Sequence, residues 1–504
     1  MKFNTTKKKA AQTRNFEGAK AWKLLPKLEL YSAVVTTSLS NSFYTTAIER
    51  VMRIRKLVAE VDPVFVAQLA VYAREQMHLR SVPLVLAVEL AMIHQGDDLV
   101  RKTVRRIIQR ADEITEILAY YQMANGRQGS KKLNRLSRQL QKGVADAFNH
   151  FDAYQFAKYN RKTEVSLRDA LFLTHPKAKD AAQQQIFNQI IADQLAVPYT
   201  WEVELTRIGQ MSFTEEKHKM EAVRNTWIAL LESGKLGYMA LMRNLRNILK
   251  ADVGRVRIKE VATRLSDPAA VRRSKQLPFR FLAAYREIKE LDMPHLELLL
   301  DALEQAILQS ADNLPGFVGE RILLASDVSG SMFQPISPKS KIQCYDIGLV
   351  LSMLAKAKSP EAITGIFGSR FATKELPAQS ILKNVEALRS IEGEVGYATN
   401  GHDVIHHLVY QEKVVDKIMI FTDLQMWNSR EDGNSIQEIW WHYKVIAPKA
   451  KLYLFDLNGY GSSPLKVGLH DVYLIAGWSD KIFEVLHALE QGEETLHLIE
   501  QIEI

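Results

Sequence analysis

The sequence predicts two parts of different fold class: an all-α helical-repeat part, and after it an α/β part with a mainly parallel sheet. Up to about residue 310, apolar residues recur at steps of three and four, a spacing typical of helices. After Asn313–Phe317, short apolar runs alternate with helical stretches. The charge also changes sign, because residues 1–310 contain 49 Lys/Arg and 33 Asp/Glu (+16), whereas residues 311–504 contain 17 and 25 (−8). Opposite signs favour two domains with different partners.

Length and composition agree with this division. The 504 residues exceed the ~250–300 at which a single core stops growing, and we place the domains at 15–315 and 316–504. A composition of 47% hydrophobic and 25% charged residues is typical of soluble globular proteins. No run of about 18 apolar residues predicts a membrane span, and no apolar segment follows the basic start as in a signal peptide. The lone Cys344 excludes an internal disulfide, so we expect a cytoplasmic protein.

The helical part contains many predicted helices of roughly 12–20 residues joined by short links. Prolines stand at helix starts, with Pro63 after Asp62 and Pro83 two residues after Ser81. Such a series predicts stacked antiparallel helix pairs. Since no fixed-period repeat is visible, the HEAT-type arrangement is an inference from geometry.

In the second part, four apolar runs are expected to be buried strands: 321–327, 417–423, 451–456 and 471–476. Strands that are apolar throughout and alternate with helices predict a parallel sheet covered on both faces. The binding crevice of such a sheet lies at the carboxyl ends of its strands, which is where Asp327 and Asp423 fall.

The segment from Asp327 to Met332 contains the sharpest motif in the chain, Asp327, Ser329 and Ser331 around Gly330. Oxygen ligands of this kind suit a hard divalent cation. The pattern resembles the metal-ion-dependent adhesion site of von Willebrand factor A domains, and this resemblance implies that Thr399 and Asp423 complete the site. It also implies bound Mg²⁺ with an open position for an acidic protein ligand. The alternative is a turn in which Asp and Ser only cap a helix.

Hydrolytic catalysis at the same carboxylates is a further alternative. It would require more acidic ligands and a general base. The sequence contains no second carboxylate cluster and no GxxxxGK[ST], HExxH or GxSxG motif. We therefore expect no enzyme activity.

The basic balance of the helical part favours nucleic acid as its partner. Lys131, Arg135, Arg138 and Lys142 are spaced three and four apart, which predicts a cationic stripe on one helix face that could follow RNA phosphates. The alternative is a solvated helix face. Further candidate RNA contacts are Arg161, Arg168 and His175. Aromatic residues are interleaved (Tyr154, Tyr159, Phe172), and we expect most of those at helical spacing to lie in the core.

Three segments, Tyr72–Pro83, Ser233–Asn247 and Leu277–Arg286, resemble the TROVE domain, which telomerase-associated, Ro and vault proteins share. With one A-type domain behind it, the chain is similar to bacterial-type members of the Ro family over about residues 15–480. The resemblance implies a HEAT-like ring closed by the A domain, acting as a monomer.

The resemblance also implies specific RNA partners. The outer basic surface would bind small Y-like RNA, and the central hole would take single-stranded 3′ ends of misfolded RNA. A 3′–5′ exoribonuclease could be tethered through the RNA. The stretch 168–177 resembles the Ro segment whose His and basic residues contact Y RNA, which adds support for His175.

Two functions follow from these patterns. The first is a non-catalytic RNA-binding protein of the Ro type that serves RNA quality control or processing. The alternative is a metal-dependent protein-interaction scaffold in which RNA binding is secondary.

Overall fold

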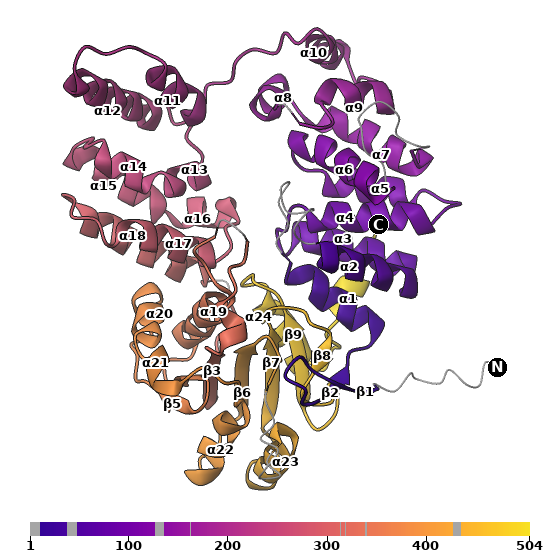
Figure 1. The fold of residues 1–504 in the computed structure, drawn as a ribbon, viewed down its shortest axis with the longest axis vertical. Helices are drawn as coiled ribbons and strands as arrows, with labels where there is room; N and C mark the ends of the chain where they lie inside the picture. Colours follow the sequence, from indigo (N-terminus) through magenta and orange to yellow (C-terminus); the bar gives the residue numbers. More distant parts are fainter. Residues whose placement is uncertain are drawn as a thin grey trace. The chain divides into compact units, whose positions relative to one another are not determined.

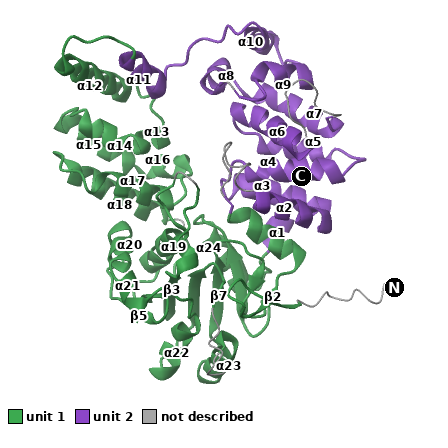
Figure 2. Cartoon of the chain, viewed as in Figure 1, with its two compact units in different colours: residues 1–36, 210–495 green, residues 37–209, 496–504 purple. Residues whose placement is uncertain are grey.

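The computed structural model describes residues 11–37, 48–125, 136–161, 163–312, 314–317, 319–337, 340–426 and 435–504. Helices predominate up to residue 310 and a helix-covered sheet follows, as Figure 1 shows. This confirms the expected fold class of helical repeats followed by an α/β part with a mainly parallel sheet. Figure 2 shows two compact units: unit 1 is Met1–Thr36 with Gln210–Thr495, and unit 2 is Thr37–Gly209 with Leu496–Ile504.

Unit 2 is built from short helices that pack on their neighbours along the chain. Within the described ranges these are α2 (Ile48–Glu60), α3 (Pro63–Glu75), α4 (Val82–Ile93), α5 (Leu99–Ile107), α6 (Ala111–Ala124), α7 (Arg138–Ala147), the 3₁₀ turn η1 (Phe148–His150), α8 (Ala153–Tyr159), α9 (Leu167–Thr174), α10 (Ala181–Ile191) and α11 (Trp201–Gly209). The apolar periodicity predicted all of these helices except α11.

Helix starts in unit 2 follow local capping chemistry. Asp62 precedes Pro63 and its carboxylate accepts a hydrogen bond from the Phe65 amide at 3.2 Å. Asp152 and Ser166 form capping boxes at the starts of α8 and α9. Each cap satisfies backbone amides that have no partner inside the helix, and typically contributes about 1 kcal/mol.

An ionic cluster crosses the core of unit 2. The Arg74 guanidinium lies 2.8 Å from Glu113, and Arg80 contacts Asp112, Glu113 and Glu116. Glu113 is fully buried and also accepts hydrogen bonds from the backbone amides that precede α6. The cluster therefore fixes α3 against the start of α6, and these charges serve the fold.

Unit 1 contains a second group of helices: α12 (Glu216–Glu232), α13 (Tyr238–Arg243), α14 (Leu245–Lys250), α15 (Arg255–Leu265), α16 (Pro268–Ser274), α17 (Phe279–Ile288) and α18 (Leu296–Ser310). The sequence pattern predicted one helix over 236–249, but the structure has two, separated at Asn244. The side chain of Asn244 donates to the Ala240 carbonyl at 2.8 Å and interrupts the regular ladder there.

The main sheet of unit 1 has the strand order β5-β4-β3-β6-β7-β9. All its pairs are parallel except β4–β5. The strands are β3 (Ile322–Asp327), β4 (Ile363–Phe367), β5 (Phe371–Thr373), β6 (Lys417–Thr422), β7 (Lys451–Asp456) and β9 (Val472–Ala476). The apolar runs predicted β3, β6, β7 and β9, but β4 and β5 were missed.

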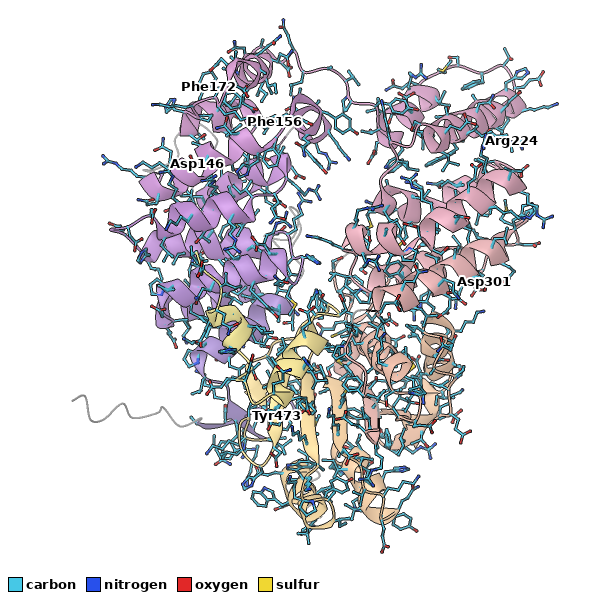
Figure 3. The ribbon with its side chains drawn as sticks, turned by 180° about the vertical axis from the view of Figure 1, so that it is seen from behind. Asp146, Phe156, Phe172, Arg224, Asp301 and Tyr473 are labelled. Atoms are coloured by element: carbon cyan, nitrogen blue, oxygen red, sulfur yellow. The ribbon has the colours of Figure 1, made fainter. Side chains whose placement is uncertain are left out.

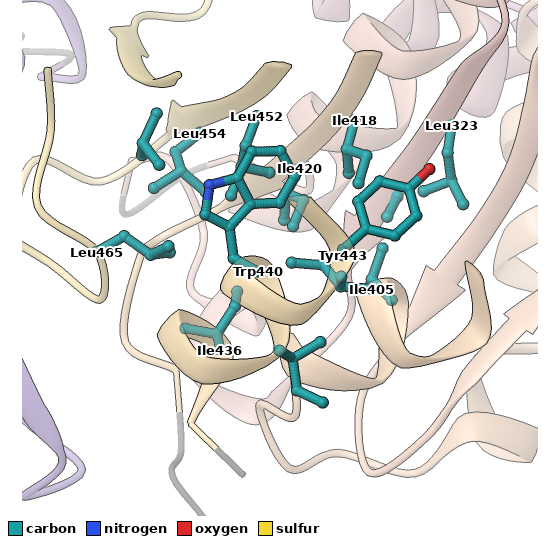
Figure 4. Packing of buried hydrophobic residues seen from close by; sticks show 14 of the residues in the cluster. Leu323, Ile405, Ile418, Ile420, Ile436, Trp440, Tyr443, Leu452, Leu454 and Leu465 are labelled. Carbon is teal, nitrogen blue, oxygen red and sulfur yellow. The ribbon is translucent and has the colours of Figure 1, made fainter. Parts of the chain in front are cut away.

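Helices cover both faces of this sheet. They are α19 (Cys344–Lys358), α20 (Leu382–Arg389), α21 (Glu392–Val395), α22 (His402–Tyr410), α23 (Ile436–Ile446) and α24 (Ile482–Glu490). Figure 4 shows Trp440 and Tyr443 of α23 packed against Ile418 and Leu454 of the strands. Trp440 is completely buried, and truncating such a side chain typically costs about 3–5 kcal/mol.

Both terminal segments of the chain lie away from the domain to which the predicted boundaries assign them. Strand β2 (Lys20–Lys23) pairs with β1 (Gln12–Arg14) and with β8 (Ser462–Ser463), and helix α1 (Pro26–Val35) packs beside β9. At the other end, α25 (His497–Glu500) packs on α3, where Gln68 donates to the Glu500 carbonyl at 2.8 Å. Strand β2 thus forms a separate three-stranded sheet with β1 and β8, residues 15–36 belong to unit 1, and the last residues join the helices of unit 2.

None of the helices in the described ranges combines the length and the apolar character needed to cross a membrane.

Candidate metal centre and nucleic-acid interface

The predicted metal residues lie at the carboxyl edge of the sheet. Strand β3 ends at Asp327 and strand β6 ends at Thr422, directly before Asp423. The two strands are parallel neighbours with Ser326 beside Phe421. The loops that follow them therefore meet at one edge, where ligands bind in such sheets.

Asp327 joins the two loops. Its carboxylate is fully buried, accepts a hydrogen bond from the Ser329 amide at 2.8 Å, and accepts another from the Thr422 hydroxyl at 2.6 Å. The hydroxyls of Ser329 and Ser331 lie 3.3 Å apart. Three of the five predicted ligands thus share one loop, whose shape the Asp327 carboxylate fixes. Thr422 supports this geometry.

Thr399 is brought to the same place by backbone contacts. The Gly330 amide donates to the Tyr397 carbonyl at 2.9 Å, so the loop 396–400 lies against the first loop. Asn400 holds this loop from the other side, donating to the Ser369 carbonyl at 2.9 Å. Thr399 is buried, and its hydroxyl forms no hydrogen bond with any other residue that the structure describes.

Asp423 completes the group and lacks a full set of partners. Its Oδ1 atom accepts a hydrogen bond from the Gln425 amide at 3.0 Å, whereas the buried Oδ2 atom has no hydrogen-bond partner within the described part of the chain. Burial raises the pKa of this carboxyl and the neighbouring charge of Asp327 raises it further, while the Gln425 amide and the nearby Ser331 hydroxyl act in the opposite direction. Burial likewise raises the pKa of Asp327.

The donor set fits a hard cation. Neither carboxylate forms an ion pair with another described residue, so two buried acids face each other without a counter-charge. A divalent cation would supply that charge, and hydroxyl and carboxylate oxygens are the ligands it prefers. The described residues contain no group of three or more His, Cys, Asp or Glu side chains suited to a metal. A site here thus depends on its hydroxyl ligands.

On unit 2, α7 presents two of the predicted RNA contacts. Arg138 and Lys142 are exposed one turn apart, while Leu140 and Val144 of the same helix are buried. The other two residues of the predicted stripe, Lys131 and Arg135, lie outside the described residues.

Helix α9 presents the next contacts. Arg168 and His175 are exposed, and Arg161 is exposed in the segment before the helix. His175 caps α9 in a left-handed conformation (φ 46°), which turns the chain away from the helix axis. The side chain of Gln141 donates to the Leu173 carbonyl at 2.8 Å, so α7 contacts the end of α9 where His175 lies.

The five candidate RNA contacts that the structure describes differ from other basic residues of the same region in their ion pairing. Arg101 pairs with Asp146, Arg106 with Glu75, and Arg110 with Asp112. In contrast, the side chains of Arg138, Lys142, Arg161, Arg168 and His175 form no ion pair or hydrogen bond with the described residues. Their polar ends are available to an external ligand.

An exposed aromatic residue lies within this surface. Phe172, labelled in Figure 3, is 52% exposed on α9, and the Arg168 guanidinium lies 5.8 Å from its ring centre. The prediction that the interleaved aromatic residues lie in the core was wrong for Phe172 and also for Tyr154, which is 43% exposed. The buried face of α9 consists of Leu167, Ala170, Leu171 and Thr174, and Phe172 falls between those positions.

Comparison with known proteins agrees with this fold. The chain is similar to the crystal structure of Deinococcus radiodurans RO (RSR) protein, with 17% identity and a TM-score of 0.57 over 93% of this chain and 100% of that one. It is 24% identical over 309 residues to telomerase protein component 1 of Mus musculus, and 24% identical over 302 residues to that of Rattus norvegicus. These matches cover 48% and 47% of this chain but only 12% and 11% of the relatives' lengths.

The model of the TROVE domain matches residues 30–207 and 194–297, which together make up more than half of the chain. The matched range includes α3 to α10, and with them every candidate RNA contact named above. The chain belongs to the TROVE domain family.

Proposed function

We propose that this chain is an RNA-binding protein of the Ro type, which holds structured RNA on the exposed surface of α7 and α9. The observation that carries the proposal is the group of five unpaired side chains on and beside these helices. Nearby arginines of the same basic run are neutralised by carboxylates, whereas the side chains of Arg138, Lys142, Arg161, Arg168 and His175 form no ion pair with the described residues.

The chemistry of these side chains suits RNA. Arginine and lysine neutralise phosphates and release counterions, and each contact contributes about 0.7–0.9 to the slope of log K against log salt. An imidazole can reach base edges or 2′-hydroxyls of unpaired nucleotides. Phe172, beside Arg168, offers an exposed ring on which a base can stack.

The finer roles rest on the family resemblance. We propose a small Y-like noncoding RNA as the structured ligand and misfolded RNA with a single-stranded 3′ end as a second one, within RNA quality control or processing. A 3′–5′ exoribonuclease tethered through the RNA belongs to the same proposal. No catalytic role is proposed for the chain itself.

Fluorescence anisotropy tests the proposal with the full chain and a labelled hairpin RNA that carries a single-stranded 3′ tail. We expect Arg168→Gln to weaken binding and to reduce the salt slope by about one. His175→Ala should weaken binding with a smaller change in slope, because the imidazole is expected to hold base edges or 2′-hydroxyls by hydrogen bonds rather than to neutralise a phosphate. Lys56→Gln is the matched control, since Lys56 is an exposed lysine on α2 of the same unit. Equal effects of Arg168→Gln and Lys56→Gln would contradict the assignment.

For the A-type domain we propose a divalent-cation site, with Mg²⁺ held by Ser329, Ser331 and Thr399 together with Asp327 and Asp423. The cation would supply positive charge and an open coordination position that an acidic side chain of a protein partner could fill. The supporting observation is the buried Asp423 Oδ2 atom without a partner. This site favours the second function, a metal-dependent protein-interaction scaffold.

Calorimetric titration of the metal-free protein with Mg²⁺ tests this site. We expect one binding event, lost in Ser329→Ala. Ser352→Ala is the control, because Ser352 is a buried hydroxyl of α19 that contacts Ser326 rather than the proposed ligands. Equal Mg²⁺ affinity in all three proteins would exclude the site.

A further inference from the structure

A second basic feature of unit 2 lies apart from the surface of α7 and α9. A cavity of about 650 Å³ opens where α5, η1 and α8 meet. No lining side chain is acidic, and the lining consists of Lys102, Arg105, Arg106, Ile108, Gln109, His150, Phe151, Gln155 and Ile504. The cavity is wide open to solvent, and its lining carries donors suited to an anion.

The three cations differ in their availability. Arg106 is held by Glu75 through two contacts of 2.7 and 2.8 Å, and Lys102 lies 3.4 Å from Asp98. Arg105 is exposed, and its side chain forms neither an ion pair nor a hydrogen bond with the described residues. Arg105 is therefore the group in the lining that an incoming anion can engage without breaking an existing pair.

The cavity adjoins the chain segment that follows His175. The Asn149 side chain donates to the Lys177 carbonyl at 2.9 Å and accepts from the Lys179 amide at 2.9 Å. The Lys179 ammonium also donates to the Asn149 carbonyl at 3.0 Å, beside His150 in the cavity wall. Exposed Lys177 and Lys179 thus continue the basic surface from the end of α9 to the cavity.

The electrostatics at His150 agree with this geometry. Burial lowers the pKa of the imidazole, and the charges of Arg105 and Lys179 lower it further, whereas the hydrogen bond to the Ile108 backbone and the carboxylate of Asp146 act in the opposite direction. The ring therefore experiences the positive charge of both groups. An anion placed between them would gain from each.

We propose that this cavity binds a phosphate group of the RNA that lies on α7 and α9, with Arg105 as its main contact. The inference rests on the proposed RNA-binding function and extends it to a site of defined size. A guanidinium can grip phosphate through two parallel hydrogen bonds, and the amides of Gln109 and Gln155 can donate to the same group or to a ribose hydroxyl. The RNA would then pass from His175 along Lys177 and Lys179 to Arg105.

The test compares the full-length chain with Arg105→Gln, Arg105→Lys and the control Lys56→Gln, measuring affinity for the tailed hairpin RNA between 50 and 300 mM salt. We expect Arg105→Gln to weaken binding roughly tenfold at low salt, as for a lost charge-assisted contact, and to reduce the salt slope by about one. Arg105→Lys should restore the slope but not the full affinity, because an ammonium does not reproduce the two-bond grip. Lys56→Gln should change neither by more than about twofold.

A second titration uses adenosine monophosphate and identifies the source of the phosphate. We expect the mononucleotide to compete with RNA for the wild-type protein only weakly, and less still for Arg105→Gln. If the mononucleotide binds tightly and this binding requires Arg105, while RNA affinity is unchanged in Arg105→Gln, the cavity is a site for free nucleotides. That result would overturn the proposal that the cavity holds an RNA phosphate. If the wild-type protein binds RNA and Arg105→Gln binds it with the same affinity as Lys56→Gln, the phosphate site in the cavity is wrong and the proposed RNA-binding function still holds. If wild type binds no RNA, the proposed function itself fails.

Discussion

Gly143 lies where α7 packs closely against α5. Adding a single methyl group at this position tests whether that packing supports the basic surface. A Cβ atom added there would lie 2.7 Å from the Val104 Cβ atom and 2.9 Å from the Arg101 carbonyl oxygen, both on α5. Backbone atoms cannot move aside as a flexible side chain can, so α7 must shift. Gly143 thus permits the close approach of the helix that carries Arg138 and Lys142.

The change in the free energy of unfolding caused by Gly143→Ala is the sum of two opposing effects. Alanine favours a helix interior over glycine by about 1 kcal/mol, whereas overpacking a tight contact costs about 1–3 kcal/mol. Because the added Cβ atom would lie below 3 Å from two groups of α5, we expect a cost in the upper part of that range, about 2–3 kcal/mol, which exceeds the gain by about 1–2 kcal/mol. For a unit of this size the melting temperature should fall by about 2–8 °C.

Thermal denaturation checks this expectation, with Gly209→Ala as the matched control. Gly209 is the last residue of α11 and has nothing within 4 Å of an added Cβ, so its substitution should be neutral or slightly stabilising. RNA affinity of Gly143→Ala should also fall, since α7 moves. A rise in melting temperature for Gly143→Ala equal to that of Gly209→Ala would refute the reasoning.

Three further substitutions test other parts of the molecule. Glu113→Gln leaves the buried Arg74 without its counter-charge and should lower the free energy of unfolding by about 3–5 kcal/mol in chemical denaturation. Phe172→Ala should weaken binding of single-stranded RNA by about 1–3 kcal/mol, whereas Phe172→Trp should retain it; equal losses in both would exclude stacking. Mg²⁺ at about 100 times its Kd should stabilise wild type by about 2.7 kcal/mol and Asp423→Ala not at all, measured as a shift in unfolding.

The metal group shows how much of a site the sequence can predict. The apolar runs ending at Asp327 and Asp423 predicted two parallel strands whose ends meet, and the structure brings these acids together. The sequence alone did not indicate that Thr422 would hold Asp327, because that contact depends on the register of β3 against β6. Strand β5 was missed because it has only three residues, and β4 because Thr364 and Gly365 interrupt its apolar run.

The positions of the two terminal segments, the first in unit 1 and the last in unit 2, could not be predicted for a related reason. Residues 12–23 form short strands whose partner in the sheet, Ser462–Ser463, lies far away in the sequence. Local periodicity contains no information about such pairing. The helices are different, because their pattern is local: the spacing of apolar residues predicted a series of helices in this part of the chain, and the structure has α2 to α10 there.

The basic surface could be predicted from the sequence only in part. Spacing alone predicted that Arg138 and Lys142 share an exposed face, which the structure confirms. Which cations are neutralised depends on tertiary contacts such as Arg101 with Asp146, and spacing cannot reveal them. Arg105 was overlooked for this reason, since it became distinct from Arg106 only once Glu75 was seen to hold the latter.

The central claim is that the free cations of α7 and α9 hold RNA, and crosslinking in cells tests it most directly. The wild-type chain and the combined variant Arg138→Gln, Lys142→Gln, Arg168→Gln would be recovered after ultraviolet crosslinking and their attached RNA sequenced. We expect wild type to yield a small set of structured RNAs and the variant to lose most of that yield at an unchanged protein level. RNA-free wild type, or an equal RNA yield from the variant, would contradict the account.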